Sequence, residues 1–243
     1  MNDIQVVLLD IEGTTTPIEY VYKTLFPYAR SRSREFLLNH YETAEVADII
    51  SMLSAQQEAD DAAGLNPPYW QFGTPGDEAG SAVAYVHWLM DRDRKVTALK
   101  ILQGRIWREG YENRRLTGEV YPDVLRAFTR WREAGVRIAI FSSGSVEAQQ
   151  LLFANSIAGD LTEYIEAYFD TTTGPKREAS SYERIAAELG IEAEKILFVS
   201  DVAEELDAAD IAGMYAALSV RPGMESPVNP DYPIARDFDS LLP

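Results

Sequence analysis

Cysteine is absent from the 243-residue sequence, and histidine occurs only twice, at His40 and His87. The absence of cysteine excludes disulfide bonds, thiolate metal sites and cysteine nucleophiles. No apolar run approaches the roughly 20 residues needed to span a bilayer. The first residues, MNDIQVVLLD, lack the cationic segment of a secretory leader. Together these absences predict a cytoplasmic protein that does not bind membranes.

Positive charge is also scarce. Lysine and arginine number 22 against 39 aspartates and glutamates, which gives a formal net charge of -17. Nucleic acids and anionic membranes require clustered Lys and Arg, so neither is expected as a partner. A phosphorylated small molecule would bind only where a local cation or backbone amides offset this field. A divalent cation held by some of the carboxylates would meet that need.

Short apolar runs alternate with segments of helical periodicity over much of the chain. Continuous apolar runs of this length are typical of strands buried on both faces, so the alternation predicts an α/β fold with a doubly wound parallel sheet. The predicted strands are Val6–Leu9, Val136–Phe141, Tyr164–Phe169, Ile196–Val199 and Ala216–Val220. The predicted helices are Asp123–Ala134, Val146–Asn155, Arg177–Leu189 and Glu204–Ala212.

Residues 17–118 interrupt this alternation and show helical periodicity without good strand candidates. We therefore predict a helical cap domain at 17–118 and a catalytic core built from 1–16 and 119–243. Helices are expected around Phe36–Asn39, Ala44–Leu53, Ala82–Met90 and Val96–Trp107, with a long loop at Gly64–Gly80. The aromatic residues Tyr69, Trp70, Phe72 and Trp88 are expected in the core of the cap. The final stretch, Pro222–Pro243, should wrap the surface, and the lack of a large apolar stripe favours a monomer.

The first predicted strand ends in two carboxylates, Asp10 and Glu12, followed by Gly13. Residues two apart on an extended strand point the same way, so both carboxylates can face one ligand. Gly13 allows the chain to turn sharply after them. One carboxylate could attack phosphorus while the other transfers protons. A solvated acidic pair at a strand end is the structural alternative, and at this point it stays open.

Three further segments place polar residues near the ends of predicted strands. Ser142, Ser143 and Gly144 precede a helix, where hydroxyls and amides bind phosphate oxygens, although a serine there can also be a simple helix cap. Lys176, in a later loop, could neutralise a phosphoryl group.

Asp201 ends another strand and would complete an oxygen-ligand site for Mg²⁺ with Asp10. Glu204 fits a favourable charge in the first turn of a helix. The role of Glu205 stays open.

These four segments, in this order, resemble the four motifs of the haloacid dehalogenase superfamily. Two longer stretches, Asp10–Thr15 (DIEGTT) and Phe141–Gln149 (FSSGSVEAQ), are similar to the enolase-phosphatase family of methionine salvage, a part of methionine biosynthesis. The segments Leu102–Trp107 and Gly118–Val120 resemble that family too. Phosphatases of the superfamily usually carry aspartate where this chain has Glu12, which keeps the carboxylic acid but adds one methylene.

The resemblance implies a bifunctional reaction. The family converts 2,3-diketo-5-methylthiopentyl 1-phosphate to an enol phosphate and then to the acireductone 1,2-dihydroxy-3-keto-5-methylthiopentene. Asp10 would form an aspartyl phosphate, and Glu12 would protonate the leaving oxygen and then activate water. Mg²⁺ would be held by Asp10, the backbone carbonyl of Glu12 and Asp201. The residues expected to bind the phosphoryl group are Ser142, Ser143, Gly144 and Lys176.

The base that enolises the substrate is not identified by the sequence. Glu12 is the economical candidate, and Lys100 is a candidate to stabilise the enolate. Three other functions remain open: another capped phosphatase for sugar or amino-acid phosphates, a haloacid dehalogenase, and a non-enzymatic phosphate-receiving signalling module. The helical insert argues against the last, because a small receiver needs no cap.

Overall fold

A computed structural model describes residues 3–225 and 231–242 of the chain. The chain divides into two compact units. Residues Met1–Val21 and Thr117–Pro243 form the first, named here the sheet unit. Residues Tyr22–Leu116 form the second, the helical unit. The roles predicted for them, a catalytic core and a cap, stay predictions.

The sheet unit is built on a six-stranded parallel sheet with the order β3-β2-β1-β4-β5-β6. The strands are β1 (Val6–Leu9), β2 (Arg137–Phe141), β3 (Ala167–Phe169), β4 (Ile196–Ser200), β5 (Tyr215–Ser219) and β6 (Ile234–Ala235). Every residue of β1 and β4 is buried, which explains why these strands are continuous apolar runs. The predicted fold class, an α/β fold with a doubly wound parallel sheet, is confirmed.

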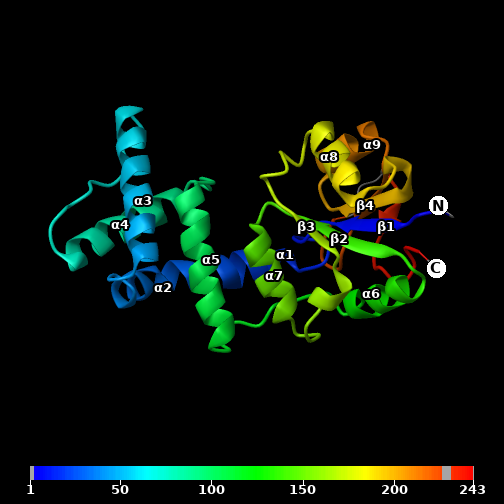
Figure 1. Cartoon of the computed structure of the whole chain (residues 1–243), viewed down its shortest axis with the longest axis horizontal. Coiled ribbons are helices and arrows are strands. Elements are labelled where there is room, and N and C mark those ends of the chain that lie inside the picture. Colours follow the sequence, from blue (N-terminus) through cyan, green and yellow to red (C-terminus); the bar gives the residue numbers. More distant parts are fainter. Residues whose placement is uncertain (1–2, 226–230, 243) are drawn as a thin grey trace. The chain divides into compact units, whose positions relative to one another are not determined.

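Helices cover both faces of this sheet. They are α6 (Val124–Glu133), α7 (Val146–Ala154), α8 (Ala179–Leu189) and α9 (Ala203–Ile211). In Figure 1, α8 and α9 lie on one side of the sheet, with α6 and α7 on the other. Val6 and Leu8 pack in one cluster with Tyr182 of α8 and Leu206 of α9. Because side chains alternate along a strand, the residues of β1 between these two point toward the helix layer on the opposite face of the sheet.

The strand order reverses beside β1. The chain runs outward from β1 through β2 to β3, then returns to place β4 on the other side of β1. In open parallel sheets, ligands bind beyond the carboxyl ends of the strands at such a reversal. Residues that follow β1, β2 and β4 therefore share the edge where a site is expected.

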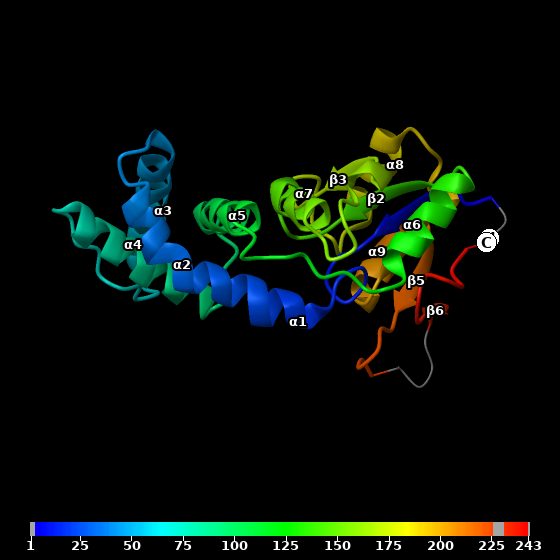
Figure 2. The same cartoon turned by 90° about the horizontal axis from the view of Figure 1, so that it is seen from below.

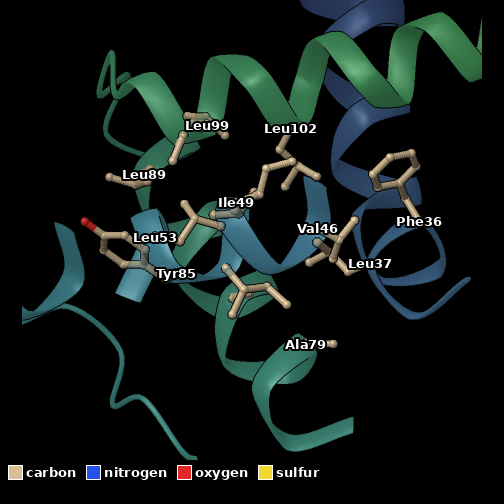
Figure 3. Packing of buried hydrophobic residues seen from close by; sticks show 14 of the residues in the cluster. Phe36, Leu37, Val46, Ile49, Leu53, Ala79, Tyr85, Leu89, Leu99 and Leu102 are labelled. Atoms are coloured by element: carbon tan, nitrogen blue, oxygen red, sulfur yellow. The ribbon is translucent and has the colours of Figure 1, made fainter. Parts of the chain in front are cut away.

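The helical unit contains the longest of the described helices. A short helix α1 (Ile18–Tyr20) and a π-helical turn (Val21–Leu25) lead into it, followed by α2 (Phe26–Asn39), α3 (Ala44–Ala62), α4 (Pro75–Met90) and α5 (Thr97–Glu112). Figure 3 shows side chains of these helices meeting in one apolar core, among them Leu37, Leu53, Leu89 and Leu102. Among the described helices, none combines the length and the apolar character that a bilayer crossing requires.

Several sequence predictions need correction. The loop expected at Gly64–Gly80 ends earlier, because Thr74 and Asp77 form a capping box and Pro75 occupies the first turn of α4. The region expected only to wrap the surface contributes strand β6, which pairs with β5 (Figure 2). Residues 226–230 and 243 of that region lie outside the described residues.

The aromatic residues of the helical unit divide into two groups. Trp70 and Trp88 are buried, as predicted. The prediction was wrong for Tyr69 and Phe72, which are 87% and 65% exposed. They belong, with the buried Trp70, to the irregular segment before α4, where no helical period fixes which side chains turn inward.

Candidate active site

Asp10 continues the ladder of the sheet beyond β1. Its backbone amide donates a hydrogen bond of 3.0 Å to the carbonyl of Val199 in β4, and its side chain is buried. The chain then turns, with the amides of Thr14, Thr15 and Thr16 all donating to the carbonyl of Ile11. Gly13 permits this turn, because its φ is +71° and a Cβ there would overlap the carboxylate of Asp201. The turn thus brings Asp201 against the backbone that follows Asp10.

Glu12 lies next to the polar loop that follows β2. The hydroxyl of Ser142 donates to Oε2 of Glu12 over 3.3 Å, and the amide of Gly144 donates to the same hydroxyl over 3.2 Å. Burial raises the pKa of Glu12, and the negative charge of Asp10 raises it further, against the opposing effect of Lys176. Glu12 therefore holds a proton more readily than an ordinary glutamate.

Lys176 is fixed by the helix that follows its loop. Tyr182 of α8 donates its hydroxyl to the carbonyl of Lys176 over 2.7 Å, and Ser181 donates to the carbonyl of Pro175 over 2.8 Å. The ammonium nitrogen lies 2.5 Å from Oδ1 of Asp10 and 2.6 Å from Oε2 of Glu205. Burial lowers the pKa of Lys176, but the two carboxylates outweigh it and raise the pKa above its ordinary value. Lys176 is therefore a fixed positive charge.

Two carboxylates follow β4. Glu205, in the first turn of α9, is buried and accepts a hydrogen bond of 2.9 Å from the hydroxyl of Ser200. Asp201 is half-buried. Burial, and then the charge of Asp10, raise its pKa to about 7. A cation bound beside Asp201 would stabilise its ionised form, which burial and the charge of Asp10 disfavour.

The sheet unit therefore brings Asp10, Glu12, Ser142, Lys176 and Asp201 to the carboxyl edge of adjacent strands, with Ser143 and Gly144 on the same loop as Ser142. Lys100 lies on α5 in the helical unit, and its role with the substrate stays a prediction. The sequence left Glu205 open. Its position in the sequence could have indicated a place in the site. Glu205 follows Asp201 by four residues, so the first turn of the helix after β4 can place its side chain near the end of that strand.

The donor set of this edge fits a magnesium ion. The charge of Asp10 acts on Glu12, Asp201 and Glu205, while Lys176 is the cation that acts on the same three groups. Negative charge is therefore in excess, and every donor is oxygen. Within the described residues, no three Asp, Glu, His or Cys side chains group tightly enough to hold a metal by themselves. Mg²⁺ does not need such a group, because it usually takes one or two carboxylates and completes its shell with water and substrate phosphate.

Comparison with known proteins identifies the family of this chain. The model of haloacid dehalogenase-like hydrolases matches residues 4–213. The chain is 50% identical to Enolase-phosphatase E1 of Synechococcus elongatus over 98% of both chains. It is 44% identical to Enolase-phosphatase E1 of Drosophila virilis over 98% of this chain and 94% of that one. The chain belongs to the enolase-phosphatase family.

A solved structure agrees with this membership. The crystal structure of the UTR4 protein of Saccharomyces cerevisiae matches with a TM-score of 0.79 and 32% identity, covering 98% of this chain and 100% of that one. The resemblance to the enolase-phosphatases of methionine salvage, drawn from DIEGTT and FSSGSVEAQ, is confirmed. The protein is a hydrolase with phosphatase chemistry, so the non-enzymatic receiver and the dehalogenase are both set aside.

Proposed function

We propose that this enolase-phosphatase forms its covalent intermediate on Asp10. The main support is the ion pair between Asp10 and Lys176, whose nitrogen lies 2.5 Å from Oδ1 of Asp10. This ion pair fixes the direction of the Asp10 side chain, and a carboxylate held in one orientation is suited to attack phosphorus. The substrate is 2,3-diketo-5-methylthiopentyl 1-phosphate, and the final product is the acireductone 1,2-dihydroxy-3-keto-5-methylthiopentene.

The dephosphorylation follows in two displacements. A carboxylate oxygen of Asp10 attacks phosphorus, the bond between phosphorus and the ester oxygen breaks, and Glu12 gives its proton to that oxygen. Water then attacks the aspartyl phosphate, Glu12 takes the proton, and Asp10 and inorganic phosphate are released. The raised pKa of Glu12, which is due first to burial and then to Asp10, supports its role as the acid of the first displacement.

The phosphoryl oxygens are proposed to bind between the loop after β2 and Lys176. Ser142, Ser143 and Gly144 offer hydroxyl and amide donors at the start of α7, and Lys176 offers the positive charge. The hydroxyl of Ser142 already contacts Glu12 over 3.3 Å. A phosphoryl group held there would therefore lie beside both proposed catalytic carboxylates.

Asp10, the backbone carbonyl of Glu12 and Asp201 are the residues proposed to hold Mg²⁺. When bound, the ion would offset negative charge on the phosphoryl group and on the carboxylates around it. Asp201 supports this assignment through its pKa of about 7, raised first by burial and then by Asp10.

Enolisation precedes phosphate loss. The carbon that bears the phosphate ester loses a proton to a base, and the neighbouring carbonyl oxygen takes up a proton from solvent as the enol forms. Glu12 is our candidate for the base, because it lies beside the loop proposed to bind phosphate. If it is the base, the proton taken from carbon is the one that Glu12 later gives to the leaving oxygen. Lys100 is our candidate to stabilise the developing enolate.

The proposed setting is a monomer in the cytoplasm that acts on a small phosphorylated molecule with no nucleic-acid or membrane partner. The net charge of -17 supports the absence of polyanionic partners. Gel filtration with light scattering tests the monomer, which a dimer mass at micromolar concentration would refute.

The central experiment follows enol absorbance and free phosphate together in the presence of Mg²⁺. In the wild type, the enol signal should rise before or with phosphate. Asp10→Asn should release no phosphate and form no hydroxylamine-sensitive phosphoprotein in acid-quenched samples, while its circular dichroism stays unchanged. Phosphate release at the wild-type rate by Asp10→Asn would refute the nucleophile. An untouched substrate, with slow metal-dependent cleavage of simple phosphate esters, would favour another capped phosphatase.

A further inference from the structure

Arg221 is a buried cation that the proposed chemistry does not use. It lies two residues beyond the end of β5, and only 2% of its surface is exposed. A guanidinium at this depth is stable only with several partners, because burial of an unpaired charge is costly. The identity of those partners indicates what the residue does.

One set of partners is the turn that carries the proposed catalytic acids. Nε of Arg221 donates a hydrogen bond of 2.7 Å to the carbonyl of Thr14. The hydroxyl of Ser219, at the end of β5, donates one of 2.8 Å to the carbonyl of Gly13. Gly13 and Thr14 directly follow Glu12, so two side chains from one strand end hold two successive carbonyls of this turn.

A second set of partners lies on the segment that returns from the helical unit. Nη1 of Arg221 lies 2.7 Å from Oδ2 of Asp123, and the guanidinium carbon lies 4.4 Å from the ring centre of Tyr121. The amide of Tyr121 in turn donates to the carbonyl of Thr15 over 3.0 Å. The chain leaves the sheet unit after Val21 and re-enters it at Thr117. Arg221 therefore joins the outgoing and the returning segments on the sheet-unit side.

We propose that Arg221 is a positioning residue for the turn Asp10–Thr16, and through it for the carboxylate of Glu12. Among the described residues, its side-chain hydrogen bonds and ion pair go to Thr14 and Asp123, so it acts through the backbone and not on the reacting atoms. A displacement of about 1 Å at a reacting group can cost about a hundredfold in rate, although substrate contacts elsewhere are intact. This inference rests on the proposed roles of Asp10 and Glu12.

The test is Arg221→Lys in the full chain. Lysine keeps a positive charge for Asp123 but loses the Nε donor to Thr14 and the planar group over Tyr121. We expect kcat for phosphate release to fall about tenfold to a hundredfold, with KM within about twofold of the wild type. Acid-quenched phosphoprotein should fall with it, since the first displacement needs Glu12 in place.

Arg130→Lys is the matched control. Arg130 also anchors the C-terminal segment, by donating to the carbonyls of Phe238 and Leu242, while Arg221 lies over the ring of Phe238. None of these contacts of Arg130 reaches the turn Asp10–Thr16. Arg130→Lys should lower the melting temperature and leave kcat and KM unchanged. A wild-type kcat in Arg221→Lys, or an equal loss of kcat in both variants, would overturn the positioning role.

Ser219→Ala provides an independent variant, should Arg221→Lys fold poorly. It removes only the hydrogen bond to Gly13, and the expected result is a drop of about threefold to tenfold in kcat with little change in KM. An unchanged kcat would count against the proposal. If Asp10→Asn were active, the proposed nucleophile would fail instead, so the two failures are distinguishable.

Discussion

The ammonium nitrogen of Lys176 lies 2.5 Å from Oδ1 of Asp10, and both side chains are buried. Oε2 of Glu205 lies 2.6 Å from the same nitrogen, so one ammonium group forms ion pairs with two carboxylates. The loop that carries Lys176 is held by α8 through Tyr182. The position of the proposed nucleophile therefore depends on residues from three separate strand-to-helix connections.

Replacement of this cation separates its catalytic role from its structural role. Lys176→Met should lower kcat by about a hundredfold or more, because charge on the transferring group loses a fixed partner. It should also destabilise the protein by about 3–5 kcal/mol, since removal of one partner leaves buried carboxylates unpaired. Chemical denaturation and phosphate release measure the two effects.

Two further variants show whether these effects come from the loss of the Lys176 cation. Lys195→Met is the control, because the one ion pair of Lys195 within the described residues joins it to Glu192 at 3.3 Å. Its replacement should change neither quantity much. The double variant Lys176→Met/Glu205→Leu removes an unpaired carboxylate and should regain stability without activity. Retained phosphate release in Lys176→Met would exclude the cation from the mechanism.

A methyl group at Gly13 should disable the site more than the fold. The φ of Gly13 is +71°, and a Cβ there would overlap the carboxylate of Asp201. Gly135 has a φ of +76°, and no atom of the described residues other than itself and its chain neighbours lies within 4 Å of a Cβ placed there. Gly135→Ala therefore tests the backbone strain without a side-chain clash. Both alanine variants should lose about 1–2 kcal/mol of stability. Only Gly13→Ala should lose Mg²⁺ binding and phosphate release, and equal activity in the two variants would contradict this account.

Much of the site follows from the sequence because its residues end buried strands. The apolar runs before Asp10, Ser142 and Asp201 are unbroken, and parallel strands with helices on both faces require such runs. Parallel strands direct all their carboxyl ends to one edge, so these three residues had to share it. Lys176 was identified because it lies between the serine motif and the Asp201 motif, in the order of the four motifs. Its loop has no repeating pattern from which the position of its side chain could be predicted.

Other features depend on contacts that no local pattern encodes. Arg221 becomes important only when β5 brings it to Thr14, about two hundred positions away in the chain. Strand β6 has two residues, Ile234 and Ala235, which is too short for alternation to be recognised. The exposed Tyr69 and Phe72 have the composition of a core, but the irregular segment that carries them decides their direction.

Magnesium binding should depend on pH through Asp201. Burial and the charge of Asp10 raise its pKa to about 7, so below that pH the metal must displace a proton. Calorimetric titration with Mg²⁺ in buffers of different ionisation enthalpy should detect close to one released proton at about pH 6, and almost none at about pH 8. The apparent affinity should rise over the same range and then level off.

The matched variants for this titration are Asp201→Asn and Asp210→Asn. Asp201→Asn should weaken Mg²⁺ binding and remove the pH dependence, and EDTA should stop phosphate release in the wild type until Mg²⁺ is restored. Asp210 is exposed at the far end of α9, and its replacement should change neither affinity nor proton release. Binding that is independent of pH in the wild type would remove Asp201 from the ligand set.

The helical unit contains its own pH-sensitive contact. Asp60 of α3 is buried and accepts hydrogen bonds from Tyr85 at 2.8 Å, Arg94 at 3.0 Å and Gln56 at 3.1 Å. Burial raises the pKa of Asp60, but these hydrogen bonds outweigh it and lower the pKa below its ordinary value. The ionised form therefore stabilises the folded state. This contribution is complete above the unfolded pKa of about 4 and is lost as the pH falls through the lower, folded pKa.

Asp60→Asn should accordingly destabilise the helical unit by about 2 kcal/mol at neutral pH, and the difference from the wild type should shrink below about pH 4. Hydrogen exchange of amides in α3 and α4 measures this locally, without the assumption that both units unfold together. Asp61→Asn, at the exposed neighbouring position, is the control and should leave exchange unchanged. A difference that grows on acidification would mean that Asp60 is held in its protonated form, which would reverse the sign of its contribution.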